Sequence, residues 1–195
     1  MATAVAALLR HLDAPPRFAV GHSVGMPVLM QLALQRDIAP QHLLGVCPAL
    51  VAPPAWYVRL VAPVLAAVVE SDAVAAGGAW VAQRTPLVRL MLESAGSSLT
   101  TPQFARYEWL CRQPDHVHAA LSMMSRWDLP ALMRDAAALR TPLTLLAGRG
   151  DRWVPLPALR RAAARLPTAT LVDVPGGHLL PEERPDEVLA RIEGP

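Results

Sequence analysis

The sequence of 195 residues contains no lysine, so all 18 of its basic residues are arginines. With 16 acidic residues they give a formal net charge of +2, which is too small to indicate nucleic-acid binding from charge alone. Alanine is abundant and there are 20 prolines, so we interpret the missing lysine as a coding bias. The arginines are therefore expected to be scattered over the surface.

Cysteine is also scarce, and no segment resembles a targeting or membrane-spanning sequence. Cys47 and Cys111 are far apart and form no CxxC pair, which favours a reduced, cytoplasmic protein. The first nine residues lack the basic region and cleavage site of a signal peptide. The longest central apolar run, Leu60–Val69, contains Pro63 and is about half of the ~20 residues that a membrane span needs.

Motifs for metal and nucleotide binding are missing as well. The sequence contains no HExxH, no P-loop and no GxGxxG. His116 and His118 are two residues apart, so on a helix their side chains face different ways and do not form a metal site. We expect neither a metal nor another cofactor.

Hydrophobic residues make up 53% of the chain, enough for a buried core, and their pattern predicts an α/β fold. An N-terminal amphipathic helix is indicated by Val5, Leu8, Leu9 and Leu12. Short apolar runs predict four strands, at 17–20, 42–47, 142–147 and 169–174, and helices are expected at 26–36, 157–166 and 185–192. Strand, helix and strand joined by short connections form a βαβ unit, so the sheet should be mostly parallel.

The stretch Gly21-His22-Ser23-Val24-Gly25 has the pattern Gly-x-Ser-x-Gly between the first strand and the next helix. This order is typical of a nucleophile elbow, a sharp strand-to-helix turn that exposes a serine at the end of a sheet. Side chains two residues before and after Ser23 are expected to collide with neighbouring backbone, which explains the two glycines. Ser23 is therefore the predicted nucleophile.

A serine nucleophile needs a histidine to take its proton and a carboxylate to orient the histidine. In α/β-hydrolase arrangements these residues follow in the order Ser, Asp/Glu, His, each after the carboxyl end of a strand. Asp151 follows the third predicted strand and His178 the fourth, both in glycine-rich loops. We predict the catalytic triad Ser23, Asp151 and His178.

Other carboxylates are weaker candidates for the acid. Asp173 lies inside a predicted strand, and Asp128 and Asp135 lie in or after the central insertion. Glu182 and Glu183 are very close to His178 in sequence. Some hydrolases carry the acid after the second of these strands, but no carboxylate occurs between residues 48 and 55, which favours Asp151.

Residues 52–135 interrupt the strand pattern and are expected to form a helical lid over one end of the sheet. We therefore expect a core made of 1–51, with the elbow, and 136–195, with the acid and histidine loops. The insertion holds four of the five tryptophans, Trp56 among them. A lid over a catalytic serine usually supplies a pocket wall, and the candidate substrate-lining residues are Trp109, Met123, Met124 and Trp127.

The motifs GHSVG, LLAGRGDRWVP and VPGGHLLPEERP resemble those of the α/β-hydrolase superfamily, across nearly the whole chain. The segments LLRHLDAPPRFAVGHSVG, HVHAALSMMSRWDL and GGHLLPEERPDEV are most similar to the magnesium-chelatase accessory hydrolases of bacteriochlorophyll biosynthesis. The resemblance implies that the lid faces a porphyrin-like or other large apolar molecule, and that a magnesium chelatase subunit is a partner.

The sequence departs from this family before the elbow. A full α/β-hydrolase has on the order of a hundred residues there, including a His-Gly loop that donates one oxyanion N–H. Here the elbow is reached at residue 23, so only the Val24 amide is expected as a donor. The first strand would also lack a neighbour on one side. We therefore expect about four strands, the C-terminal two-thirds of a hydrolase fold.

These observations predict a serine hydrolase that acts on an ester or similar carbonyl of an apolar substrate. Two alternatives remain open. The chain could be a non-catalytic accessory or carrier protein that binds a tetrapyrrole or a chelatase subunit. It could also be an inactive truncated fragment, because one oxyanion donor is missing.

Overall fold

The computed structural model describes residues 1–51, 73, 76–77, 80, 84–125 and 127–193. The chain divides into two compact units, and each is described by itself. The core unit comprises Met1–Ala52, Ala95–Ser98 and Leu129–Pro195, and the second unit comprises Pro53–Ser94 and Leu99–Asp128. The three-segment division expected from the sequence stays a prediction, as does the role of residues 52–135 as a lid.

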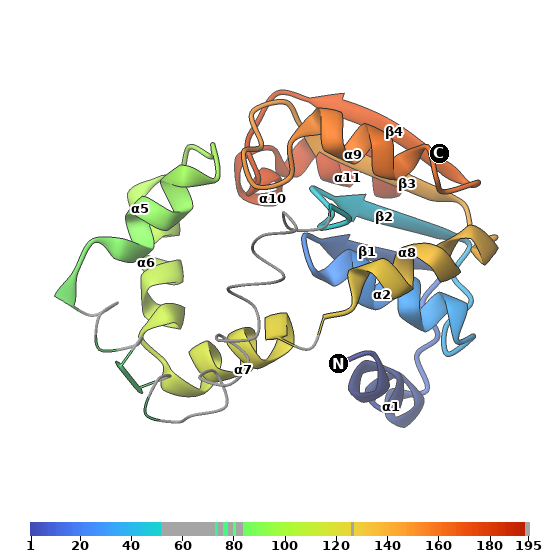
Figure 1. Cartoon of the computed structure of the whole chain (residues 1–195), viewed down its shortest axis with the longest axis horizontal. Coiled ribbons are helices and arrows are strands. Elements are labelled where there is room, and N and C mark those ends of the chain that lie inside the picture. Colours follow the sequence, from blue (N-terminus) through green and yellow to red (C-terminus); the bar gives the residue numbers. More distant parts are fainter. Residues whose placement is uncertain (52–72, 74–75, 78–79, 81–83, 126, 194–195) are drawn as a thin grey trace. The chain divides into compact units, whose positions relative to one another are not determined.

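The core unit is built on four parallel strands in the order β1-β2-β3-β4, as Figure 1 shows. They are β1 (Phe18–His22), β2 (His42–Val46), β3 (Leu143–Gly148) and β4 (Ala169–Val174). Gly21 pairs with Gly45, and Gly45 with Leu145, so the strands end at one common edge. The predicted α/β fold with a parallel sheet is confirmed, and each strand begins and ends within two residues of its expected position.

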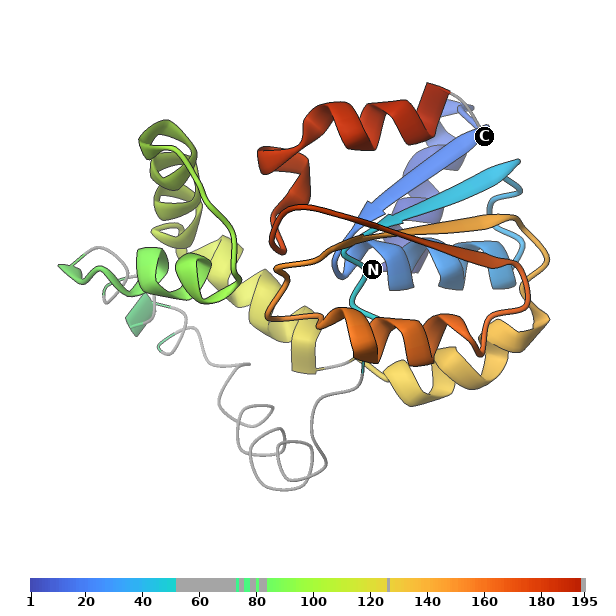
Figure 2. The same ribbon diagram turned by 90° about the horizontal axis from the view of Figure 1, so that it is seen from above.

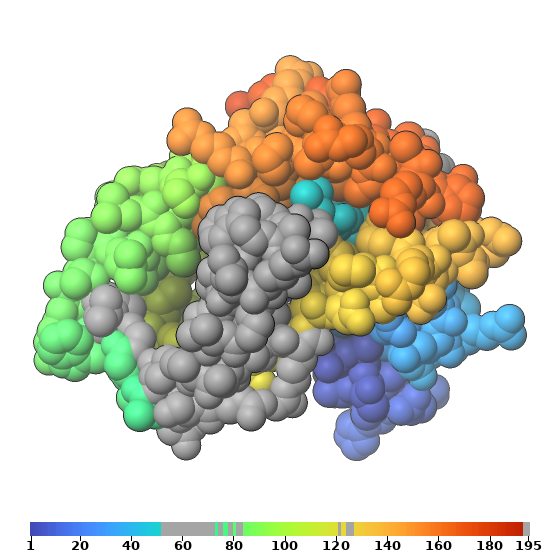
Figure 3. Space-filling model, viewed as in Figure 1, coloured from blue at the N-terminus to red at the C-terminus, as the bar shows by residue number. Residues whose placement is uncertain are grey.

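Helices cover both faces of this sheet, because β2 and β3 are apolar on both sides and need burial on both. One face packs on α2 (Gly25–Leu34) and α9 (Leu156–Ala163). On the same side α8 (Leu129–Asp135) packs on α2 and is followed by a short 3₁₀ turn, η2 (Ala136–Ala138). The other face packs on α11 (Pro185–Glu193), which follows the short α10 (Leu180–Glu183). Figure 2 shows the sheet between these helices, and Figure 3 shows α2, α8 and α9 forming the surface of the core unit on their side.

The N-terminal helix α1 (Ala2–Leu12) forms as predicted, but its expected apolar face is not buried. The helix packs mainly against α2, and Ala6 is its one buried residue. Leu8 and Leu12 are more than half exposed. The apolar spacing predicted the helix correctly. The face that contacts α2, however, is centred on Ala6, a small residue that is not part of that spacing.

The described part of the second unit is helical, as expected for this segment. It contains α5 (Leu87–Ser94), α6 (Thr101–Cys111) and α7 (Pro114–Ser125), which pack consecutively. The Thr100 N-cap and Gln103 form a capping box at the start of α6. Among the described residues, no helix has both the length and the apolar character that crossing a bilayer requires.

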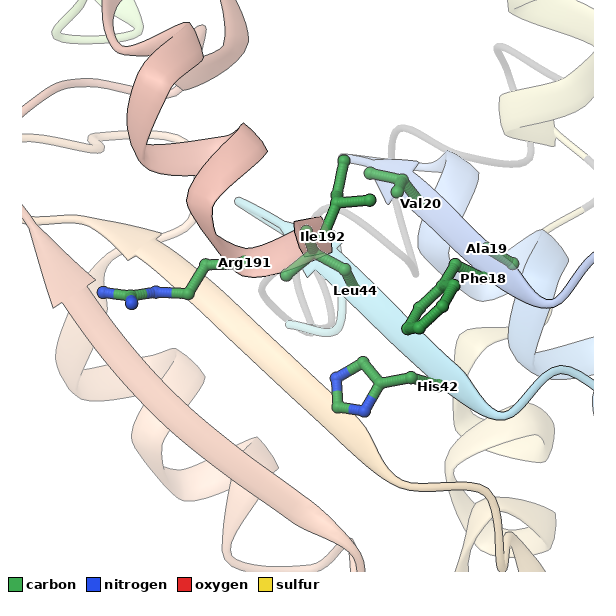
Figure 4. A pocket seen from close by; sticks show the side chains of 7 residues that line it. All are labelled: Phe18, Ala19, Val20, His42, Leu44, Arg191 and Ile192. Carbon is green, nitrogen blue, oxygen red and sulfur yellow. The ribbon is translucent and has the colours of Figure 1, made fainter. Parts of the chain in front are cut away.

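Strand β1 lies at the edge of the sheet within the described residues. Phe18 and Val20 point to the α11 face, and each is 44% exposed. Together with Leu44 and Ile192 they border a shallow hollow, shown in Figure 4. An open edge strand with exposed apolar side chains promotes pairing between molecules.

We predict that Val20→Lys reduces self-association of this chain. A lysine on an edge strand opposes strand pairing between copies through charge repulsion. Light scattering as a function of protein concentration measures the effect. Leu189→Lys is the matched control, because Leu189 is 50% exposed but lies on α11. Equal reductions in the two variants would show that exposed apolar area, and not the strand edge, drives association.

Candidate active site

The turn between β1 and α2 consists of two residues, Ser23 and Val24, since β1 ends at His22 and α2 begins at Gly25. Ser23 has φ 49°, a left-handed conformation that non-glycine residues rarely adopt. Its backbone N–H donates to the carbonyl of Val46 at 2.9 Å, which fixes the turn to β2. The strained turn presents Ser23 at the carboxyl end of the sheet, as expected for a nucleophile elbow.

The two glycines of the motif have different surroundings. A Cβ at Gly21 would lie 2.6 Å from the backbone nitrogen of Met26, far inside van der Waals contact. At Gly25 an added Cβ would meet no atom within 4 Å outside the helix itself and its chain neighbours. The expected collision is therefore found at Gly21 and not at Gly25, where an added Cβ would lie in open space.

Asp151 follows β3 and is held by three hydrogen bonds. Its Oδ1 accepts the backbone N–H groups of Trp153 at 2.9 Å and Val154 at 2.8 Å. Its Oδ2 lies 2.9 Å from Nδ1 of His178. Both side chains are almost fully buried. The two loop amides fix the carboxylate, which in turn holds the imidazole ring.

His178 follows β4 and completes the contact with the elbow. Its Nε2 lies 2.9 Å from Oγ of Ser23. When the ring proton is on Nδ1 and forms the hydrogen bond to Asp151, Nε2 accepts a hydrogen bond from the serine hydroxyl. The structure thus brings the three predicted residues into one chain of hydrogen bonds, from three loops at the same end of a parallel sheet.

Two aromatic rings flank the imidazole of His178. The ring of His22 lies 5.2 Å away and that of Trp153 lies 5.1 Å away, between centroids. Nε2 of His22 donates to the carbonyl oxygen of His178 at 2.9 Å. Burial lowers the pKa of His22 below its ordinary value of 6.5, so the ring is neutral near pH 7. Sequence reasoning included His22 in the elbow without predicting this contact.

Cys47, just past β2, lies against the same buried groups. Its Sγ donates to the carbonyl of Gly177 at 3.5 Å, and burial raises the pKa of the thiol to about 12. The donor atoms of Cys47, Asp151 and His178 lie within 4.8 Å of one another. The carboxylate and the imidazole bind each other and the thiol binds the Gly177 carbonyl, so all three groups act as hydrogen-bonding partners in this structure.

The alternative carboxylates bind elsewhere. Asp173 pairs with Arg149 at 2.7 Å and Arg160 at 3.3 Å on the surface, and the hydrogen bond from Arg149 chiefly lowers the pKa of its carboxyl. Glu183 accepts the backbone N–H groups of Gly177 and Ser98. Of the carboxylates considered in the sequence, Asp151 is the one that contacts the imidazole of His178.

The short segment Ala95–Ser98, which lies within the predicted lid segment 52–135, belongs to the core unit. Ser97 is buried, and its Oγ accepts the backbone N–H of Leu179 at 2.7 Å. Ser97 and Leu179 are 82 positions apart in sequence, so local pattern could not reveal the contact. Glu183 was likewise considered only as an alternative to Asp151 as the orienting acid, and its contacts with Gly177 and Ser98 were not predicted.

The four candidate substrate-lining residues lie in the second unit. Trp109 is an exposed residue of α6, Met123 and Met124 are in α7, and Trp127 follows α7 as a partly buried residue. Trp56 lies outside the described residues. A role of these side chains in lining a pocket stays a prediction.

Comparison with known proteins agrees with this geometry. The sequence profile of the alpha/beta hydrolase family matches residues 2–191. The chain belongs to this family. An α/β-hydrolase-fold protein from Burkholderia ambifaria superposes with a TM-score of 0.74 at 24% identity, over 98% of this chain and 70% of that chain. A thermophilic esterase from Thermogutta terrifontis gives 0.71 at 20% identity, over 98% and 69%. At these identities the two structures support the α/β-hydrolase fold alone.

One curated relative within this hydrolase family carries a functional name. The magnesium-chelatase 30 kDa subunit of Rhodobacter capsulatus is 32% identical over 195 aligned residues, covering 95% of this chain. The chain spans 64% of the length of that relative. The predicted resemblance to the α/β-hydrolases, and within them to magnesium-chelatase-associated proteins, is confirmed.

We predict that Gly21→Ala lowers the free energy of unfolding by about 1–3 kcal/mol or more, because its Cβ meets backbone that has no room to move. Gly25→Ala is the matched variant. It should leave stability unchanged or raise it by up to about 1 kcal/mol, since alanine favours the helix. Urea unfolding followed by circular dichroism measures both. Similar losses in the two variants would contradict the asymmetry of the elbow.

We also predict that His22 makes stability sensitive to acid. Its pKa is lower in the folded state than when unfolded, so the unfolded chain binds more protons and stability is lost as pH falls below about 6.5. The titratable groups facing His22 are His178, Asp151 and Glu182, and all remain in His22→Gln. The fall in Tm between about pH 7.5 and about pH 5.5 should be larger in the wild type than in His22→Gln. Equal falls would mean that His22 does not carry the effect.

Proposed function

We propose that this chain is a serine hydrolase in which Ser23 is the nucleophile, His178 the general base and acid, and Asp151 the orienting acid. The single observation that carries the proposal is the unbroken hydrogen-bond chain from Asp151 through His178 to Oγ of Ser23. Membership of the alpha/beta hydrolase family and the strained turn at Ser23 support the same assignment.

The proposed reaction is acyl transfer to the enzyme followed by hydrolysis. Oγ of Ser23 forms a bond to the substrate carbonyl carbon while its proton passes to Nε2 of His178. The tetrahedral intermediate then expels the leaving group, which takes that proton. Water attacks the acyl-enzyme by the same route and restores Ser23. Asp151, held by two backbone amides, accepts a hydrogen bond from Nδ1–H of His178 and stabilises the imidazolium while it is present.

The backbone N–H of Val24 is the proposed donor to the oxyanion. Val24 follows the nucleophile directly, at the N-cap of α2, where the positive end of the helix dipole also favours negative charge. Within the described part of the chain, its amide has no hydrogen-bond acceptor. The amide is thus available to a substrate oxygen.

We propose an ester or similar carbonyl of an apolar molecule as the substrate, with Trp109, Met123, Met124 and Trp127 contributing to its pocket. These side chains are apolar and come from the inserted helices. A cytoplasmic location, which the two unpaired cysteines favour, is part of the same proposal.

A second candidate function rests on the name of the curated relative. That protein is a magnesium-chelatase 30 kDa subunit, so this chain could instead bind a tetrapyrrole or a chelatase subunit in bacteriochlorophyll biosynthesis without catalysis. Titration with protoporphyrin, followed by absorbance, separates the candidates. Equal binding by the wild type and Ser23→Ala, with no ester hydrolysis by either, would favour the carrier.

We predict that Ser23→Ala lowers kcat for p-nitrophenyl ester hydrolysis by at least about 10³-fold, because the nucleophile is lost. Ser94→Ala is the matched control, because Ser94 lies on α5, outside the proposed triad, and its hydroxyl donates to the Met91 carbonyl. It should retain wild-type kcat. Hydrolysis that survives Ser23→Ala undiminished would exclude Ser23 as nucleophile.

A further inference from the structure

The segment Ala95–Ser98 lies across the two loops that carry Asp151 and His178. The carbonyl oxygen of Ala95 accepts two backbone N–H groups, from Arg152 at 3.2 Å and from His178 at 3.3 Å. One peptide group therefore joins the acid loop to the histidine loop. The chain enters this segment from α5 and leaves it toward α6, yet the segment itself belongs to the core unit.

The next contacts fix the backbone on both sides of His178. Oγ of Ser97 accepts the N–H of Leu179 at 2.7 Å, so the amides of residues 178 and 179 both bind the segment. On the other side, the Glu183 carboxylate accepts the N–H of Gly177 at 2.6 Å through one oxygen and that of Ser98 through the other. Bonds to a charged acceptor are about twice as strong as neutral ones.

Glycines allow the three backbones to approach this closely. Gly96 has φ 79°, and a Cβ there would lie 2.0 Å from the carbonyl oxygen of Gly150 in the acid loop. A Cβ at Gly177 would lie 2.4 Å from the carbonyl carbon of Gly96. At these two glycines the segment is therefore packed backbone against backbone on both loops.

We infer that Ala95–Ser98 and Glu183 together form a clamp that sets the direction of the His178 ring between Asp151 and Ser23. Ser97 and Glu183 are positioning residues in this scheme, because they contact the backbone of residues 177–179 and not the imidazole. Three consecutive amides, those of Gly177, His178 and Leu179, are held, which leaves the peptide planes around His178 little freedom. The inference deepens the proposed function and rests on it for its catalytic consequence.

Ser97→Thr and Ser97→Val provide a matched pair, because they have the same shape and differ only in the hydroxyl that accepts the Leu179 N–H. Ser97→Val should lower kcat for p-nitrophenyl ester hydrolysis by about 10- to 100-fold relative to Ser97→Thr, with little change in KM, since small displacements of a catalytic group have effects of this size. Glu183→Gln should also lower kcat, because the amide oxygen can replace only one of the two carboxylate oxygens that accept the Gly177 and Ser98 N–H groups.

A readout independent of turnover is the ¹⁵N NMR spectrum of the protein labelled at histidine, with His178→Ala used for assignment. The ring shifts of His178 report whether its proton is held on Nδ1. We expect a single Nδ1–H form in the wild type, Ser97→Thr and Ser94→Ala, and a mixture of tautomers in Ser97→Val and Glu183→Gln. If Ser97→Val does not fold, the tautomer of His178 in Glu183→Gln is sufficient to test the clamp.

Unchanged shifts in Ser97→Val and Glu183→Gln would overturn the clamp, whether or not kcat falls, because the loss would then not act through the His178 ring. Mixed tautomers together with a lower kcat would support it. Mixed tautomers in a chain whose wild type hydrolyses no ester would support the clamp and reject the proposed function, so the two failures can be distinguished.

Discussion

The hydrogen bond between Nδ1 of His178 and Oδ2 of Asp151 is the contact on which the geometry of the site depends. It is buried, and it joins loops that follow β3 and β4. Two backbone amides hold the Asp151 carboxylate, and the Ala95 carbonyl, Ser97 and Glu183 hold the backbone around His178. A buried polar pair of this kind is favourable only when all of its hydrogen-bonding groups are satisfied, and the surrounding loops provide those partners.

Parallel strand topology makes this contact possible. All four strands end at one edge of the sheet, so loops from residues 23, 47, 151 and 178 meet there although the chain separates them widely. Glycine at the loop positions lets the backbones touch, as at Gly96 and Gly150. The site is therefore formed mainly by backbone packing, and the three side chains proposed for catalysis are its few polar groups.

Much of this could be predicted from the sequence, because local patterns carry it. Apolar runs followed by Gly-Arg-Gly-Asp or Gly-Gly-His revealed both the strands and the loops after them. What local pattern did not reveal depends on partners distant in sequence. Nothing near Ser97 indicates that it binds Leu179, and the apolar stripe of α1 did not show that Ala6 is the buried residue.

The division of the chain has a consequence for recombination. The helical unit is not one continuous insertion, since Ala95–Ser98 returns to the core between α5 and α6. A chimaera that exchanged everything between residues 53 and 128 as a block would also exchange the contacts behind His178. An exchange of the second unit would have to be made in two separate pieces, on either side of this short stretch, and the stretch itself would have to stay with the sheet.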